Sequence, residues 1–123
     1  MTLYTGTKII KAKPMNRKEY YDLRGWTVDP SEAKYDGYLV EYEGESNHPD
    51  FKGYISWSPK HVFESSYRQS GNLNFGQAIE FLKRGECVTR GDHQLILIKG
   101  VIYQLTPWVA TQADMLAEDW QVV

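Results

Sequence analysis

The sequence predicts an α+β fold in which short helices pack on an antiparallel β-sheet within a single compact domain. Strand-like segments follow one another without an intervening helix at 37–42 and 53–57, and again at 95–98 and 101–105, which favours antiparallel pairing. Residue types that start helices precede four segments with apolar residues at helical spacing. A chain of 123 residues with 41% apolar residues is also suited to one hydrophobic core.

Residues that end a strand or begin and end a helix predict the first two elements of the chain. β-branched residues over 7–13, followed by Pro14, predict a strand. Asn16 is placed to cap a helix over 17–24, and Gly25 is placed to end it.

The middle of the chain predicts a strand pair and a second helix. A loop begins at 29–31, and the polar segment 43–52 joins the predicted strands 37–42 and 53–57. The pair 58–59 then offers a serine cap followed by proline at the first helical position, which predicts a helix.

The second half opens with a capping box, in which Asn74 and Gln77 satisfy each other's backbone amides. The helix that follows ends at Gly85, and a short strand is expected over 86–90. The dipeptide 99–100, Lys-Gly, predicts the turn of a β-hairpin.

A further capping box starts the last helix. Thr111 and Asp114 have the required spacing, and a final strand is expected over 120–123. The polar linker near residue 70 divides the chain into an N-terminal module, 1–70, and a C-terminal module, 72–123, which we expect to share one core.

Composition and charge exclude several classes of protein. The net charge of −2 argues against a protein that binds long nucleic acid. The longest apolar run, 95–101, is interrupted by Lys99 and is too short to cross a membrane, and 1–13 lacks the pattern of a secretory leader. The single cysteine, Cys87, cannot form an internal disulfide, so we expect a cytoplasmic protein.

The residues that usually carry catalysis or metal binding do not form a recognisable motif. His48, His61 and His93 lack a second ligand at metal spacing, and only His93 has an acidic neighbour, Asp92. Cys87 in a predicted strand is typical of a small buried residue. We therefore expect a binding protein, neither an enzyme nor a protein with a cofactor or metal.

Two segments of the second half form a combined signature. One is 74–90, with the pattern NFGxAIxxLKxGxxVxR, and the other is 108–123, with the pattern WxxxQxDMLAEDWxVV. Together they resemble the small phage proteins of the second Thoeris anti-defence type. The resemblance covers 72–123 and does not explain the first seventy residues. That part, notably 38–42 and 53–59, looks like an uncharacterised small phage module of unknown role.

The resemblance implies a sponge that binds and sequesters cyclic nucleotide immune messengers without cleaving them. The messengers implied are cyclic ADP-ribose isomers and, in some members, cyclic dinucleotides. It also implies a homo-oligomer, with a tetramer favoured over a dimer, in the cytoplasm of the infected bacterial host. The partners expected are thus a small nucleotide and further copies of the chain.

Nucleotide chemistry selects candidate ligand-binding residues in the second half. Trp108 can stack on a base, and Arg90 can pair with phosphate. Thr111 and Gln112 lie where a helix begins and can meet a phosphate, while Asp114 can accept hydrogen bonds from a ribose or an adenine.

One aromatic position departs from the family pattern. Family members usually carry a tryptophan soon after the arginine that corresponds to Arg90, whereas this chain has Gly-Asp-His at 91–93. Tyr54, Trp57 or Tyr103 can supply the missing aromatic surface.

Each candidate also has a structural interpretation. A capping box alone explains Thr111 and Asp114, alternation favours core packing for Trp120, and Tyr54 and Trp57 equally suit an oligomer interface. The rival function is a protein–protein interaction module without a nucleotide ligand. A hydrolase that degrades the messenger is a third class, and it would need a general base.

Overall fold

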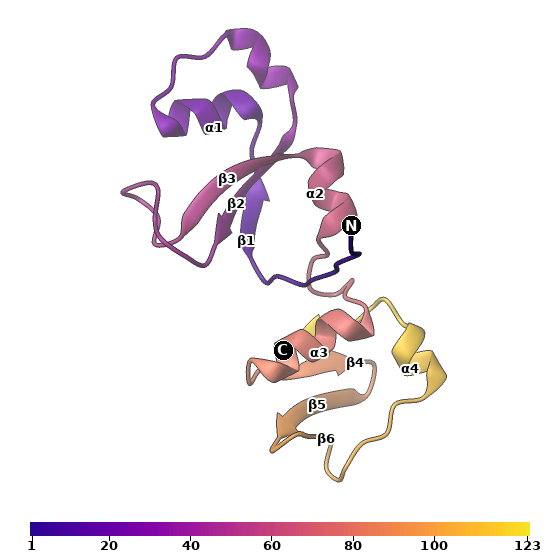
Figure 1. Cartoon of the computed structure of the whole chain (residues 1–123). Coiled ribbons are helices and arrows are strands. Elements are labelled where there is room, and N and C mark those ends of the chain that lie inside the picture. The colour runs from indigo at the N-terminus through magenta and orange to yellow at the C-terminus, as the bar shows by residue number, and fades with distance from the viewer. The chain divides into compact units, whose positions relative to one another are not determined.

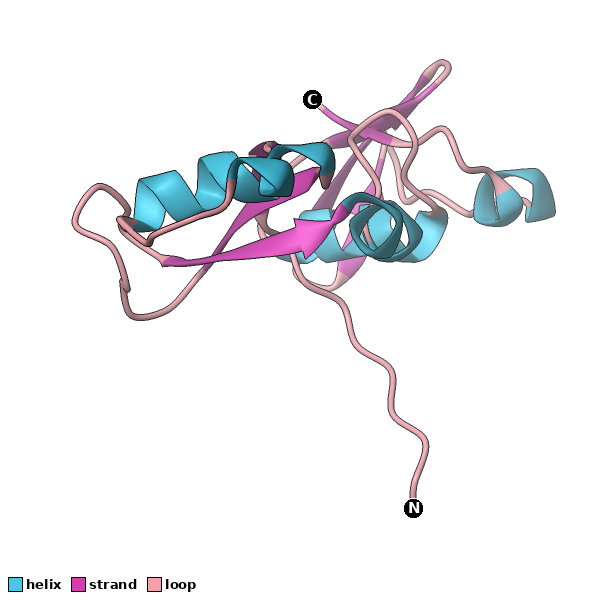
Figure 2. Ribbon diagram, turned by 90° about the horizontal axis from the view of Figure 1, so that it is seen from above, coloured by secondary structure: helices cyan, strands magenta, loops and turns pink.

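The computed structural model describes all 123 residues and groups them into two compact units (Figure 1). The N-terminal unit is 8–67, and the C-terminal unit is 68–123 together with 1–7. Each unit has its own antiparallel sheet and short helices, which confirms the predicted α+β class. Residues 1–10 have no regular secondary structure (Figure 2).

A three-stranded antiparallel sheet in the order β1-β2-β3 forms the centre of the N-terminal unit. Its strands are β1 (Lys11–Pro14), β2 (Gly37–Tyr42) and β3 (Tyr54–Pro59). The predicted strand 37–42 is confirmed. The first strand is shorter than the predicted 7–13, because only residues from Lys11 onward pair with β2.

Helix α1 (Arg17–Arg24) has the predicted ends. Asn16 Oδ1 accepts a hydrogen bond from the Glu19 amide at 2.8 Å, and the Glu19 carboxylate accepts one from the Asn16 amide at 3.1 Å. Gly25 then takes a left-handed conformation with φ 74°, which ends the helix.

Helices α1 and α2 (Lys60–Ser66) cover opposite faces of this sheet. Tyr20 of α1 packs in the buried cluster with Leu39, whereas Phe63 of α2 stacks on Tyr38 with ring centroids 4.1 Å apart. Neighbouring residues of a strand point to opposite faces, so Tyr38 and Leu39 place the two helices on either side.

Two details of the N-terminal unit correct the sequence-based expectation. Helix α2 begins after Pro59 without a side-chain cap, because the Ser58 hydroxyl is directed to the Pro59 carbonyl at 3.5 Å. The expected loop at 29–31 contains instead the start of a 3-10 helix, η1 (Pro30–Lys34), which the Asp29 carboxylate caps.

The C-terminal unit contains a four-stranded antiparallel sheet in the order β6-β5-β4-β7. Its elements are α3 (Phe75–Lys83), β4 (Val88–Arg90), β5 (His93–Ile98), β6 (Val101–Tyr103), α4 (Gln112–Leu116) and β7 (Gln121–Val122). Lys99 and Gly100 have φ values of 48° and 80°. These values confirm the predicted two-residue hairpin turn between β5 and β6.

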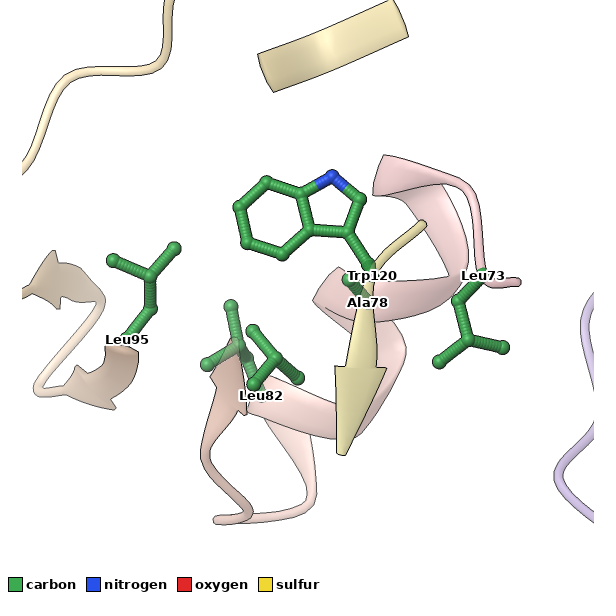
Figure 3. Close-up of a cluster of buried hydrophobic side chains, with 6 residues drawn as sticks. Leu73, Ala78, Leu82, Leu95 and Trp120 are labelled. Carbon is green, nitrogen blue, oxygen red and sulfur yellow. The ribbon is translucent and has the colours of Figure 1, made fainter. Parts of the chain in front are cut away.

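Trp120 lies at the centre of the C-terminal core, and Figure 3 shows its six-membered ring turned toward Leu82 and Leu95. It is fully buried, which confirms the core interpretation. The buried members of this cluster come from α3, the sheet and the segments beside them: Leu73, Ala78, Leu82, Val88, Leu95 and Trp120.

The segment before α3 is bonded to the end of the chain. Arg68 forms an ion pair with Glu118 at 2.8 Å, and the Ser70 hydroxyl accepts a hydrogen bond from the Val122 amide at 2.9 Å. The Gly71 amide donates to the Trp120 carbonyl at 3.0 Å. The predicted linker near residue 70 is thus held on the C-terminal sheet.

The buried side chains form two clusters, one in each unit. The N-terminal cluster contains Tyr20, Leu39 and Ile55 and has no member in common with the cluster around Trp120. The reason is local: each sheet has a helix from its own unit on its apolar face, so each half buries its own apolar residues. No helix has the length and apolar character that crossing a bilayer demands.

Candidate functional site

Asp114 is the one buried charged residue of the chain, and it organises the start of α4. Its Oδ2 accepts hydrogen bonds from the Thr111 amide at 2.9 Å and from the Thr111 hydroxyl at 2.8 Å. The Thr111 hydroxyl in turn accepts one from the Asp114 amide at 3.2 Å. The predicted capping box is therefore formed.

The other carboxylate oxygen of Asp114 faces two basic side chains from the sheet. Arg90 Nη1 lies 3.2 Å from Oδ1, and His93 Nε2 lies 3.5 Å from the same atom. The Thr111 amide, followed by the Thr111 hydroxyl and the charges of His93 and Arg90, lowers the pKa of Asp114, while burial acts in the opposite direction. Asp114 is thus held as a carboxylate.

Arg90 lies between two carboxylates. Its Nε donates to Asp119 Oδ1 at 2.7 Å, in addition to the contact of Nη1 with Asp114. The Asp114 side chain is 4% exposed, whereas that of Asp119 is 66% exposed. The two ion pairs join β4 to α4 and to the residue before Trp120, so Arg90 ties the sheet to the closing segment.

Trp108 provides a half-buried aromatic surface beside this ion-pair cluster. Its ring lies edge-on to His93, with centroids 5.6 Å apart, and edge-on to Trp120 at 6.2 Å. Its amide donates to the Ile102 carbonyl at 2.8 Å, so the segment before α4 runs along the edge of β6. Trp108 is thereby fixed at the boundary between the core and the surface.

Sequence reasoning missed the role of His93. The hairpin register pairs His93 with Arg90 on the neighbouring strand, and its Nδ1 lies 3.1 Å from Gln104 Oε1. Gln104 Nε2 donates to the Asp92 carbonyl at 3.3 Å. The signal was available, because residues that flank a tight β-turn pair across it.

The structure brings together four of the seven predicted ligand-binding residues: Arg90, Trp108, Thr111 and Asp114. Gln112, the first residue of α4, is exposed next to them. Tyr54 and Trp57 lie on β3 of the N-terminal unit. There Trp57 Nε1 donates to the Met15 carbonyl at 2.8 Å, and Tyr54 is half exposed.

The hydrogen bonds divide the cluster into a framework and an accessible rim. Both oxygens of Asp114 are engaged within the chain, so Asp114 and Thr111 act as the framework. The hydrogen bonds of Arg90 within the chain use Nε and Nη1 and leave the second amino group, Nη2, unused, and Trp108 is half-buried. Arg90 pairs with His93 across the hairpin, and the Trp108 ring lies edge-on to His93. A cation and an aromatic ring on either side of one residue suit a ligand that carries both an anionic group and a planar base.

Comparison with known proteins gives one family for this part of the chain. Residues 92–123 match the Tad2-like family, the Thoeris anti-defense 2-like domain. The matched Tad2-like segment runs from the β4–β5 turn through β7 and includes His93, Trp108 and Asp114 but not Arg90. This confirms the family resemblance for the C-terminal part, and it supports a Thoeris anti-defense role.

The Tad2-like match is less than half of the chain and begins after Arg90, so the opening motif, 74–90, lies outside it. No curated protein and no solved structure matches this chain. No group of three histidine, cysteine, aspartate or glutamate side chains is arranged to hold a metal ion.

Proposed function

We propose that this protein is an anti-defense sponge that binds cyclic nucleotide immune messengers and sequesters them without cleavage. The observation that carries the proposal is the Tad2-like match over 92–123, which includes Trp108 and Asp114 and begins two residues after Arg90. Cyclic ADP-ribose isomers are the first messengers to test, and cyclic dinucleotides are the second.

The rim of the Asp114 cluster supports the proposal by its chemistry. Arg90 offers guanidinium donors to a phosphate, and Trp108 offers a ring on which a base can stack, which is worth about 1 to 3 kcal/mol per base. Asp114 and Thr111 contribute by holding Arg90 and the start of α4 in place. Gln112 is the exposed polar side chain nearest in sequence to this framework.

Self-association is part of the proposal. Among the exposed large apolar residues of the Tad2-like segment, three are at least four-fifths exposed: Leu105 is 96% exposed, Val109 is 85% exposed and Leu116 is 80% exposed. Large exposed apolar surface is typical of sites that contact another molecule. A second copy of the chain, in a dimer or a tetramer, would cover them.

The decisive experiment separates binding from cleavage. The purified full chain is incubated with each cyclic ADP-ribose isomer and with a panel of cyclic dinucleotides, and the mixture is then heat-denatured. Mass spectrometry identifies what remains free before denaturation and what is released by it. A sponge depletes one messenger and releases it intact, whereas an altered product would make the protein a hydrolase.

A matched pair of variants tests the contribution of Arg90. Arg90→Gln removes the cation that is paired with Asp114 and Asp119, and we expect at least a tenfold loss of messenger retention, as for loss of a charge-assisted phosphate contact of about 1.5 kcal/mol or more. Arg68→Gln removes the same charge from an exposed ion pair with Glu118 and should retain the messenger. Equal retention by both variants would contradict the assignment.

The rival function, a protein–protein interaction module without a nucleotide ligand, is favoured by the same exposed residues, Leu105, Val109 and Leu116. It predicts that no messenger is depleted at any concentration tested. It also predicts that Leu116→Lys abolishes capture of a protein partner from infected cells. If Leu116→Lys and the natural chain both deplete a messenger, nucleotide binding does not depend on this exposed apolar surface.

A further inference from the structure

The two carboxylates bonded to Arg90 differ in how firmly they are held. Asp114 is buried, and its other oxygen is fixed by two hydrogen bonds from Thr111. Asp119 is two-thirds exposed, and its contact with Arg90 Nε is its one hydrogen bond. An exposed ion pair of this kind is worth about 0 to 1 kcal/mol, so Asp119 can leave Arg90 at little cost.

The position of Asp119 is that of an anionic ligand. A carboxylate on the Nε side of a guanidinium occupies one of the places where a phosphate oxygen binds, because both anions accept hydrogen bonds from the same donor edge. Arg90 Nη1 remains bonded to the buried Asp114, which keeps the guanidinium oriented when the other carboxylate departs. The Nη2 group is available to the same incoming anion.

We propose that Arg90 is an anion site which the chain itself occupies with Asp119, and that a phosphate-bearing ligand binds by displacing this side chain. Asp119 is thus an internal competitor that sets the affinity of the site and selects for anions more highly charged than a carboxylate. The part of this proposal that concerns the messenger rests on the proposed function. The anion site itself can be tested without any messenger.

The chain offers a closely matched control. Asp119 and its neighbour Glu118 have equally exposed side chains, at 66%, and each forms one ion pair with an arginine. Asp119→Asn and Glu118→Gln therefore make the same change in net charge, in adjacent positions, with the loss of one exposed pair each. Only Asp119→Asn removes a carboxylate that is bonded to Arg90.

The experiment titrates the full chain with inorganic pyrophosphate at constant ionic strength and follows the NMR signal of the Arg90 Nε–H group. Two-dimensional spectra of the backbone amides establish that each variant is folded. We expect Asp119→Asn to bind pyrophosphate about two to five times more tightly than Glu118→Gln, the range given by the loss of an exposed pair of up to about 1 kcal/mol. Glu118→Gln should match the natural chain.

Two results would overturn the inference. One is equal pyrophosphate affinity of Asp119→Asn and Glu118→Gln, and the other is an Arg90 signal that pyrophosphate does not shift in either variant. The messenger arm repeats the comparison with the cyclic ADP-ribose isomers. If the natural chain retains no messenger while Asp119→Asn binds pyrophosphate more tightly, the sponge function fails and the self-occupied anion site stands.

Discussion

The indole nitrogen of Trp120 donates a hydrogen bond to the main-chain carbonyl of Asp114, at 3.0 Å. Both residues are buried, and the bond lies between the centre of the C-terminal core and the first helical turn of α4. The carbonyl of Asp114 and its carboxylate thus have separate partners. Packing of the core and orientation of the candidate site are coupled through this one residue.

The first prediction concerns that bond. Trp120→Phe removes the donor and leaves both a cavity and an unpaired carbonyl, so we expect the free energy of unfolding to fall by about 2 to 4 kcal/mol. Denaturant unfolding followed by circular dichroism measures the change. Trp26→Phe, at a side chain that is 49% exposed, should change the stability by less than about 1 kcal/mol. Similar losses for the two variants would contradict the assigned role.

The second prediction concerns the charge of Asp114. Asp114→Asn places an amide NH₂ opposite donors from Thr111 or Arg90, and we expect it to be destabilising at neutral pH by about 2 kcal/mol. The pKa of Asp114 in the folded chain is lowered, chiefly by the Thr111 amide. The charged form is therefore favoured by folding, and its stabilisation is present above about pH 4 and is lost as the pH falls through the folded pKa.

The measurement for Asp114 is denaturant unfolding at a series of pH values from 7 down to about 2.5. The difference in stability between the natural chain and Asp114→Asn should shrink as the solution becomes more acidic than pH 4. Asp92→Asn serves as the control, because it removes a charge without removing a side-chain hydrogen bond. A difference that stays constant with pH would show that the charge of Asp114 is not what stabilises the fold.

The third prediction concerns the close approach of β2 and β3. A Cβ atom added at Gly37 would lie 2.3 Å from the Ser58 carbonyl oxygen and 2.4 Å from the ring of Trp57. Gly37→Ala therefore forces the strands or the indole to move, at a cost of about 1 to 3 kcal/mol in the free energy of unfolding. Gly6→Ala, where no atom lies within 4 Å of the added carbon, should leave the melting temperature unchanged.

The fourth prediction concerns the outer edge of β3. The side-chain amide of Asn47 binds both backbone groups of Ile55: it accepts from the amide at 2.7 Å and donates to the carbonyl at 2.9 Å. Asn47→Ala would leave this edge unpaired, so we expect a loss of about 1 to 3 kcal/mol and faster aggregation on heating. Light scattering during a thermal ramp measures the second effect. Asn72→Ala, at an exposed loop position, should aggregate no faster than the natural chain.

Local sequence signals predicted the helices well, because their determinants lie within four residues of each other. The capping boxes at Asn74 and Thr111 and the N-cap at Asn16 all form as expected. The prediction failed at Ser58, where the same residue types, serine followed by proline, leave the helix without a side-chain cap. A serine cap depends on the direction of its hydroxyl, which composition does not determine.

The candidate site could be predicted only in part. The contact between Thr111 and Asp114 follows from their spacing, whereas Arg90 meets Asp114 across 24 positions and Asp119 across 29. Those contacts depend on how β4 is placed beside β7, and sequence periodicity gives no register between distant strands. Only their aromatic rings favour Tyr54 and Trp57 as ligand-binding candidates, and the structure places both residues on β3 of the N-terminal unit.

The bonds between residues 68–71 and the end of the chain decide where a fragment of the C-terminal unit can begin. A fragment cut at residue 72, where the family-like sequence starts, loses the hydroxyl acceptor of Ser70 for Val122 and the amide donor of Gly71 for Trp120. It also loses the ion pair of Arg68 with Glu118. Its last strand would fray. Protease trimming of the full chain should therefore stop before residue 68, and expression of the C-terminal unit should start there.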